Sequence, residues 1–138
     1  MLSLILGAGM ALQSADTIFV NGRVYVQKGR FETALAVLGD KVLAVGSDAT
    51  VKALAGKTTR IIDLKGRLVT PGFNDAHVHF IDDIDERKGT LEPGKLADLG
   101  LFAADLFKLE PRKILTTPVD LTMVGGRVVF ERTSAHTP

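Results

Sequence analysis

The chain has 138 residues, of which 46% are hydrophobic and 24% are charged, a balance typical of one folded globular domain and not of a disordered chain. Its formal net charge of +1, with basic residues scattered singly, gives no electrostatic reason to expect nucleic acid or a membrane surface as a partner. The absence of cysteine excludes disulfides, thiolate metal sites and cysteine nucleophiles.

Residues 1–15 form an apolar leader. Its first twelve residues carry no charge and are too few for the roughly 20 apolar residues that span a membrane. The leader resembles the apolar region of a secretory signal, with the small-x-small pattern Gly9-Met10-Ala11, but it lacks a basic leading region. Two interpretations stay open: a signal remnant, which would make the protein secreted or periplasmic, or a disordered leader on a cytoplasmic protein.

Short runs rich in β-branched residues, joined by two-residue turns, dominate the rest of the chain. Turns of the Asn-Gly type favour a type I′ hairpin, because both central residues must adopt φ > 0. Four such hairpins and a further strand at residues 99–102 predict a mainly β fold, an antiparallel β-sandwich. The predicted hairpins are residues 17–20 with 23–26, 34–38 with 41–45, 61–64 with 67–69, and 121–124 with 127–130.

The sequence predicts one short helix after Gly46. Ser47 or Asp48 can cap its N-terminus, and Val51, Leu54 and Ala55 form an apolar stripe at helical spacing. Gly56 would supply the left-handed residue that ends the helix. Residues 111–114 are expected to form one additional helical turn.

A single change of composition divides the chain. The charged stretch at residues 81–88 separates two β-rich segments and is typical of a solvated connection. We therefore expect one sandwich domain over residues 16–131, built from an N-terminal half (16–80) and a C-terminal half (89–131) that the 81–88 linker joins, followed by a tail at 132–138.

The order of several motifs resembles one enzyme family. Pro71-Gly72-Phe73-Asn74-Asp75-Ala76-His77-Val78-His79 is followed by Gly89-Thr90-Leu91-Glu92-Pro93-Gly94-Lys95 and by Val124-Gly125-Gly126-Arg127-Val128. Together with residues 17–24, 36–46 and 62–69, these segments resemble the amidohydrolase superfamily. Within it, their motif sequences are most similar to the subgroup related to N-substituted formamide deformylases. The resemblance implies metal-dependent hydrolysis of carbon–nitrogen bonds other than peptide bonds.

The resemblance also implies a deletion. In the family, a (β/α)₈ barrel of several hundred residues lies between the His-x-His strand and the Gly-x-Leu-Glu-Pro-Gly-Lys segment. Here only nine residues, Phe80 to Lys88, separate the two motifs. We expect the barrel to be missing, so that the chain corresponds to the small sandwich domain of the family.

His77 and His79 are the candidate metal ligands. Residues i and i+2 of a strand point to one face, so both imidazoles could contact the same ion. Neutral imidazole suits Zn²⁺ and neighbouring divalent metals. In the family, such a pair helps to bind the metal that lowers the pKa of a water molecule and polarises the substrate carbonyl.

The rest of that metal centre has no counterpart in the sequence. The family also uses two further histidines, a carboxylate or carboxylated lysine, and an aspartate base, all from later barrel strands. The remaining histidine here is His136, in the tail. Asp75 could orient His77 or could be a turn residue. Four acidic side chains could lend oxygen ligands, although no spacing specifies it: Asp82, Asp83, Asp85 and Glu86.

The expected function is therefore that of an amidohydrolase sandwich domain with the catalytic barrel deleted and no activity by itself. We predict no catalytic residues in this chain, a metal half-site at His77 and His79, and zinc or another divalent metal in the parent family without functional binding here. Two alternatives stay open. The chain could be a binding module that self-associates as a homo-oligomer through the surface that barrel loss exposes, or a minimal zinc site completed across a homo-oligomer.

Overall fold

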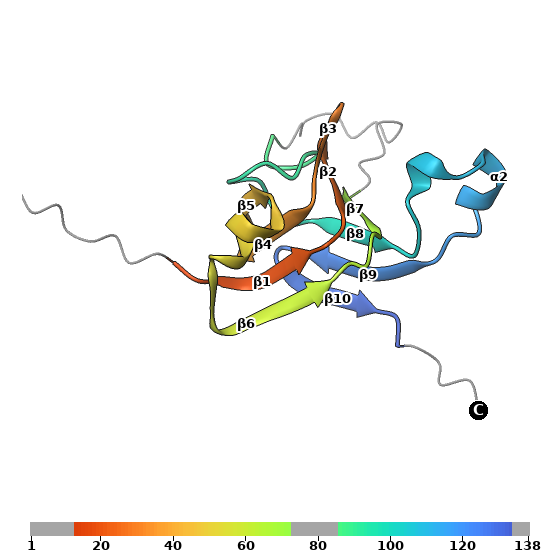
Figure 1. The fold of residues 1–138 in the computed structure, drawn as a ribbon. Helices are drawn as coiled ribbons and strands as arrows, with labels where there is room; N and C mark the ends of the chain where they lie inside the picture. The colour runs from red at the N-terminus through yellow and green to blue at the C-terminus, as the bar shows by residue number, and fades with distance from the viewer. Residues whose placement is uncertain (1–12, 73–85, 134–138) are drawn as a thin grey trace, which may run out of the picture.

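The computed structural model describes residues 13–72 and 86–133, and within them two β-sheets form a sandwich (Figure 1). The predicted mainly β fold is confirmed. A four-stranded sheet has the order β5-β4-β1-β6, and a six-stranded sheet has the order β10-β9-β8-β7-β2-β3. The strands of the first sheet are β1 (Ala15–Val20), β4 (Ala34–Leu38), β5 (Lys41–Gly46) and β6 (Ala55–Asp63). Those of the second are β2 (Arg23–Gln27), β3 (Arg30–Glu32), β7 (Leu68–Pro71), β8 (Leu99–Phe102), β9 (Val119–Val124) and β10 (Arg127–Glu131).

The main core lies between the sheets. Val24 and Val26 are fully buried in it, whereas Arg23 and Tyr25 are only partly buried, so the period-2 pattern of β2 predicted its inner face correctly. Fourteen buried residues form this core, and burying each large aliphatic side chain contributes on the order of 2 kcal/mol. A smaller cluster around Ile18, Val20 and Val51 lies on the other face of the four-stranded sheet, where the helix covers it.

Two of the four predicted hairpins are correct. β4 and β5 pair antiparallel with Leu38 opposite Lys41, and β9 and β10 pair antiparallel with Val124 opposite Arg127. Gly39 has φ 59° in the first turn, where it takes the left-handed conformation that favours glycine. The predicted strand at residues 99–102 is also confirmed, as β8.

The other two predicted hairpins are wrong, because in each the chain changes sheets at the turn. β1 and β6 lie in the four-stranded sheet, and β2 and β7, which follow them, lie in the six-stranded sheet. We call the two crossings, residues 21–22 and 64–67, the sheet switches. β1 pairs parallel with β6 and β2 pairs parallel with β7, so the two switches run side by side. Leu64 N donates to Val20 O at 2.8 Å and Arg23 N donates to Arg67 O at 3.0 Å, which holds them in register.

The predicted helix is present but shorter than expected. α1 (Asp48–Lys52) begins after Ser47, whose Oγ accepts from Thr50 N at 3.3 Å, and Val51 is buried beneath it. The predicted C-terminal role of Gly56 is wrong, because the chain enters β6 at Ala55 and Gly56 does not adopt positive φ. Pairing of the long strand β6 with β1 outweighs the local helical stripe, an example of tertiary context overriding a short pattern.

The connection from β8 to β9 contains η1 (Leu106–Lys108) and α2 (Pro111–Ile114), the latter at the predicted helical turn. Phe107 of η1 packs against Tyr25 and Phe31, with ring centroids 5.2 and 5.3 Å away. Arg23 Nε lies 3.1 Å from Asp105 Oδ2, and its guanidinium lies 3.8 Å from the centre of the Phe31 ring. These contacts fix the connection over the outer face of β2 and β3.

The segment that precedes β8 is part of the core. Leu91 and Ala97 are fully buried, and Leu91 N donates to Val26 O at 2.9 Å. β8 then pairs antiparallel with β7, with Pro71 opposite Leu99. Strands from both sides of residues 73–85 therefore share one sheet, an arrangement that the proposed domain organisation requires.

Candidate functional site

The predicted metal ligands His77 and His79 lie outside the described residues, as do His136, Asp75, Asp82, Asp83 and Asp85. The structure describes the chain up to Gly72, whose N donates to Asp98 O at 2.9 Å beside the Pro71–Leu99 pair. It describes it again from Glu86, whose carbonyl accepts from Lys95 Nζ. In the sequence, the candidate half-site thus follows the end of β7 by a few residues.

Within residues 13–72 and 86–133, no group of three or more His, Cys, Asp or Glu side chains could hold a metal ion. In the same part of the chain, no helix is long and apolar enough to cross a membrane. The metal prediction therefore depends on residues outside this part of the chain, above all His77 and His79, and stays a prediction.

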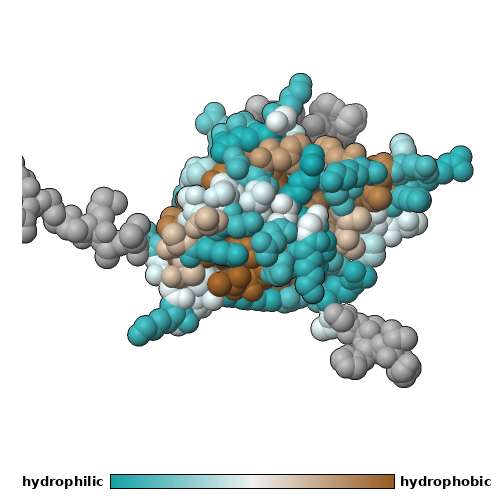
Figure 2. Space-filling view, in the orientation of Figure 1, coloured by the Kyte–Doolittle hydropathy of each residue, from teal (hydrophilic) through white to brown (hydrophobic). Residues whose placement is uncertain are grey.

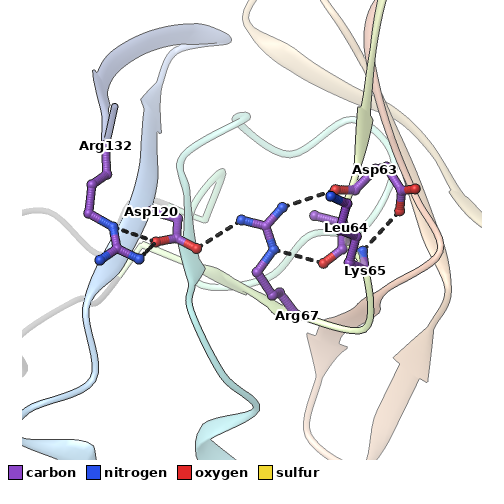
Figure 3. A network of polar contacts seen from close by, with 6 residues as sticks. All are labelled: Asp63, Leu64, Lys65, Arg67, Asp120 and Arg132. Atoms are coloured by element: carbon purple, nitrogen blue, oxygen red, sulfur yellow. Dashed lines mark hydrogen bonds and ion pairs between the residues drawn. The ribbon is translucent and has the colours of Figure 1, made fainter. Parts of the chain in front are cut away.

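A charged cluster that the sequence did not indicate lies where the second sheet switch meets β9. Arg67 Nε donates to Leu64 O at 2.8 Å, and Arg67 Nη2 donates to Asp63 O at 3.0 Å. Arg67 Nη1 donates to Asp120 Oδ2, also at 2.8 Å (Figure 3). Three bonds in different directions hold the Arg67 guanidinium in one position, because its planar donors have fixed geometry.

Asp120 lies between two guanidinium groups (Figure 3). Arg132 Nε donates to Asp120 Oδ1 at 2.8 Å, and Arg132 Nη2 donates to the same oxygen at 2.5 Å. Burial would raise the pKa of the Asp120 carboxyl, but the hydrogen bonds from Arg67 and Arg132 outweigh it and hold the pKa below its ordinary value. Asp120 is therefore ionised at neutral pH. We call Arg67, Asp120 and Arg132 the arginine–aspartate cluster.

The arginine–aspartate cluster borders a cavity of about 540 Å³. Ile62 of β6, Leu101 of β8 and Leu121 of β9 supply its apolar lining. Glu131 also lines it and pairs with Arg60 Nη2 at 2.6 Å, an ion pair that joins β10 to β6. The cavity thus opens between the edges of the two sheets, with apolar side chains beside charged ones.

The stability that the arginine–aspartate cluster provides should disappear in acid. Because the pKa of Asp120 is lowered in the folded state, its contribution is present above the unfolded-state pKa of about 3.9 and is lost as the pH falls through the folded-state pKa. At pH 7, we expect Asp120→Asn to lower the free energy of unfolding by roughly 1 kcal/mol, since the arginine partners are partly exposed. Urea unfolding of both proteins at pH 7 and at pH 3 should show the difference shrinking; a constant difference would contradict this account.

The outer face of the six-stranded sheet carries no charge along one row across four strands. Thr70 lies opposite Gly100, Gly100 opposite Thr122, and Thr122 opposite Phe130. Opposite residues of paired strands point to the same face. Along this row Thr70 is buried, Gly100 and Thr122 are partly exposed, and Phe130 is exposed. Beside this row lies a groove of about 280 Å³, which extends to Gly72. We call this surface the outer uncharged face.

Large exposed apolar side chains are also present elsewhere on the described surface. Figure 2 shows brown, hydrophobic patches separated by teal, hydrophilic side chains on the face that it draws. The exposed large apolar residues are Ile61, Phe107, Ile114, Leu115, Val124, Val129 and Phe130. Val124, Val129 and Phe130 come from β9 and β10, the strands at one end of the row just described.

Comparison with known proteins points to one superfamily. The sequence model of the amidohydrolase family matches residues 83–130. A dihydroorotase of Bacillus subtilis is 38% identical over 111 residues, which cover 78% of this chain and 24% of the relative. An allantoinase of Enterococcus faecalis is 41% identical over 68 residues, which cover 49% of this chain and 13% of the relative.

A solved structure of an uncharacterised metal-dependent hydrolase from Pyrococcus furiosus is 32% identical, with a TM-score of 0.42, over 46% of this chain and 14% of that one. This chain spans between 12% and 24% of the length of the curated relatives it matches. The family model and the curated relatives support the relationship to the amidohydrolase superfamily that the motifs predicted.

Proposed function

We propose that this chain is the sandwich domain of a metal-dependent hydrolase that acts on carbon–nitrogen bonds other than peptide bonds, with the catalytic barrel absent and no hydrolytic activity by itself. The pairing of β7 with β8 is the observation that supports this best. A domain inserted between these strands would begin and end close together, as domain insertions usually do. The same proximity lets a short connection replace the insertion while the strand pairs are kept.

The metal half-site follows from the same proposal. His77 and His79 come after β7, so they would stand at the start of the absent barrel. When bound, a divalent metal supplies an activated water and polarises the substrate carbonyl. Two imidazoles leave most of a metal's coordination positions to other groups. The family resemblance places those groups, and the aspartate base, in the absent barrel. We also propose that the parent enzyme resembles N-substituted formamide deformylases in the bond it cleaves.

A second candidate function is self-association through the outer uncharged face. Val124, Val129 and Phe130, on the two strands at one end of the uncharged row, favour it, because they are large apolar side chains that remain exposed, and exposed apolar patches mark interaction sites. In this alternative, a second copy of the chain covers the surface that the parent enzyme would bury. It is also the setting in which a zinc site could be completed by His77 and His79 of two copies.

One preparation tests these proposals. We expect the purified chain with added Zn²⁺ to show no hydrolysis of an N-substituted formamide, allantoin or dihydroorotate above the rate of a His77→Ala/His79→Ala variant. Chelator-sensitive hydrolysis that this variant lacks would overturn the proposal. Size-exclusion chromatography of the same sample, with and without Zn²⁺, separates the alternatives: a metal-independent dimer supports self-association, and a dimer that requires Zn²⁺ and both histidines supports the shared site.

A further inference from the structure

The arginine–aspartate cluster contains more positive charge than it neutralises. Two guanidiniums, Arg67 and Arg132, share the one carboxylate of Asp120. The other acidic residue of the cavity, Glu131, is paired with Arg60 and so does not compensate for the excess. After these pairs are counted, the charged side chains that line the 540 Å³ cavity carry one excess positive charge.

Hydrogen-bond donors are available to a ligand at the same place. Among the described residues, Arg67 uses three of its five N–H groups, on Leu64 O, Asp63 O and Asp120, which leaves two. Within the same part of the chain, Arg132 directs two N–H groups to Asp120, which leaves three. Because the Arg67 side chain is held by three bonds and is only 28% exposed, little of its conformational freedom remains to be lost on binding.

The apolar part of the cavity lining is small. Leu101 and Leu121 border the cavity from the core with only 2% of each residue exposed, whereas Ile62, which packs against the same core, is partly exposed. A cavity of about 540 Å³ lies within the size range of small-molecule sites, which combine apolar walls with a few positioned polar groups. A carboxylate suits paired guanidiniums because its two oxygens can accept two parallel N–H bonds.

We propose that this cavity binds a small monocarboxylic acid whose carboxylate contacts Arg67 and Arg132 and whose apolar body lies against Ile62. The proposal does not depend on the proposed hydrolase ancestry, because the residues concerned belong to the sandwich itself. The competing explanation is that the cluster only joins the second sheet switch to β9, in which case the cavity has no ligand.

The test is a titration of the full chain with benzoate at pH 7, in which the NMR chemical shifts of the backbone amides report binding. We expect saturable shifts at residues around the cavity, with a dissociation constant on the order of 1 mM for a ligand of this size. Benzamide has the same shape without the charge, and inorganic phosphate has charge without the apolar body. Both should bind at least about tenfold more weakly; equal binding of either would overturn the ligand class that we propose.

Two variants with opposite effects separate ligand binding from a purely structural cluster. Arg132→Gln should weaken benzoate binding about tenfold, the loss expected for one charge-assisted hydrogen bond. Asp120→Asn removes the competing carboxylate and should strengthen binding by a few-fold, even though it lowers stability. Arg30→Gln is the matched control, because it removes the same charge from an exposed pair with Glu32 on β3, and it should bind as the wild type does.

Each variant is checked for the wild-type pattern of shifts away from the cavity before titration. No saturable binding of benzoate to the wild type, or weaker binding to a folded Asp120→Asn protein, would overturn the proposal. A loss of affinity in Arg30→Gln equal to that in Arg132→Gln would do the same, because it would show a response to net charge alone.

Discussion

Replacing Gly126 by alanine is expected to lower the free energy of unfolding by about 3 kcal/mol or more. Gly126 has φ 73°, a conformation that disfavours any residue with a Cβ. An added Cβ would also overlap the carbonyl oxygen of Gly39 and would lie 2.9 Å from the Gly39 carbonyl carbon. Backbone atoms cannot move aside as the end of a flexible side chain can, so the two hairpin tips would have to separate.

That separation would break a contact between distant parts of the chain. Gly126 N donates to Ala97 O at 3.1 Å, and Ala97 N donates to Asp40 O at 2.8 Å. The tips of the β4–β5 and β9–β10 hairpins thus meet at the segment that leads into β8. Losing the approach of Gly126 to Gly39 would loosen all three segments at once.

Gly125→Ala is the matched control for this prediction. Gly125 also has positive φ, 53°, but its added Cβ would meet no atom within 4 Å among the described residues. We expect it to lower stability by about 1 kcal/mol, the effect of the backbone conformation alone. Urea unfolding at pH 7 measures both variants. Equal midpoints for Gly125→Ala and Gly126→Ala would contradict the role assigned to the contact between the hairpin tips.

Local sequence was sufficient to predict the strands that local turns connect. The Gly39-Asp40 and Gly125-Gly126 turns predicted their hairpins because each joins strands that remain neighbours. The Lys65-Gly66 turn is locally similar, with φ 50° and 78°, and Arg67 N donates to Leu64 O across it. Its flanking strands nevertheless enter different sheets. Pairing of β6 with β1 and of β7 with β2 decides that choice, and a turn dipeptide carries no information about such distant partners.

The same limit applies to the arginine–aspartate cluster. Arg67 and Asp120 are 53 positions apart, and the sheet topology brings them together, so no spacing in the sequence could indicate the pair. A weaker signal was present in the run Asp120 to Arg132, where a confirmed hairpin places its two ends close together. His77 and His79, by contrast, were found from a local motif, and their role as metal ligands stays a prediction.

Replacing Gly22 by alanine tests the sheet switches directly. An added Cβ would lie 2.5 Å from Leu64 Cβ and 2.9 Å from Leu64 Cγ, both closer than such atoms approach in folded proteins. Leu64 is fully buried, and its Cβ is fixed to the backbone, so a change of rotamer cannot relieve the overlap. We expect a loss of about 2 to 3 kcal/mol in the free energy of unfolding, the range for overpacking a well-packed core.

Gly46→Ala is the matched control for the sheet-switch prediction, because Gly46 also lies outside the positive-φ region and its added Cβ would meet no described atom within 4 Å. It should change the free energy of unfolding by less than about 0.5 kcal/mol. The same urea experiment compares Gly22→Ala with Gly46→Ala.

The two possible outcomes differ in what they say about the sheet switches. If Gly22→Ala unfolds at the midpoint of Gly46→Ala, then Gly22 and Leu64 are not in contact. The parallel pairing of β1 with β6 and of β2 with β7 would then lack the close packing that joins the two sheet switches. If Gly22→Ala alone is destabilised, the glycine of the Asn21-Gly22 dipeptide, whose local pattern predicted a hairpin, is required instead for a long-range contact. Without a side chain at Gly22, the first sheet switch can pack directly against Leu64 of the second.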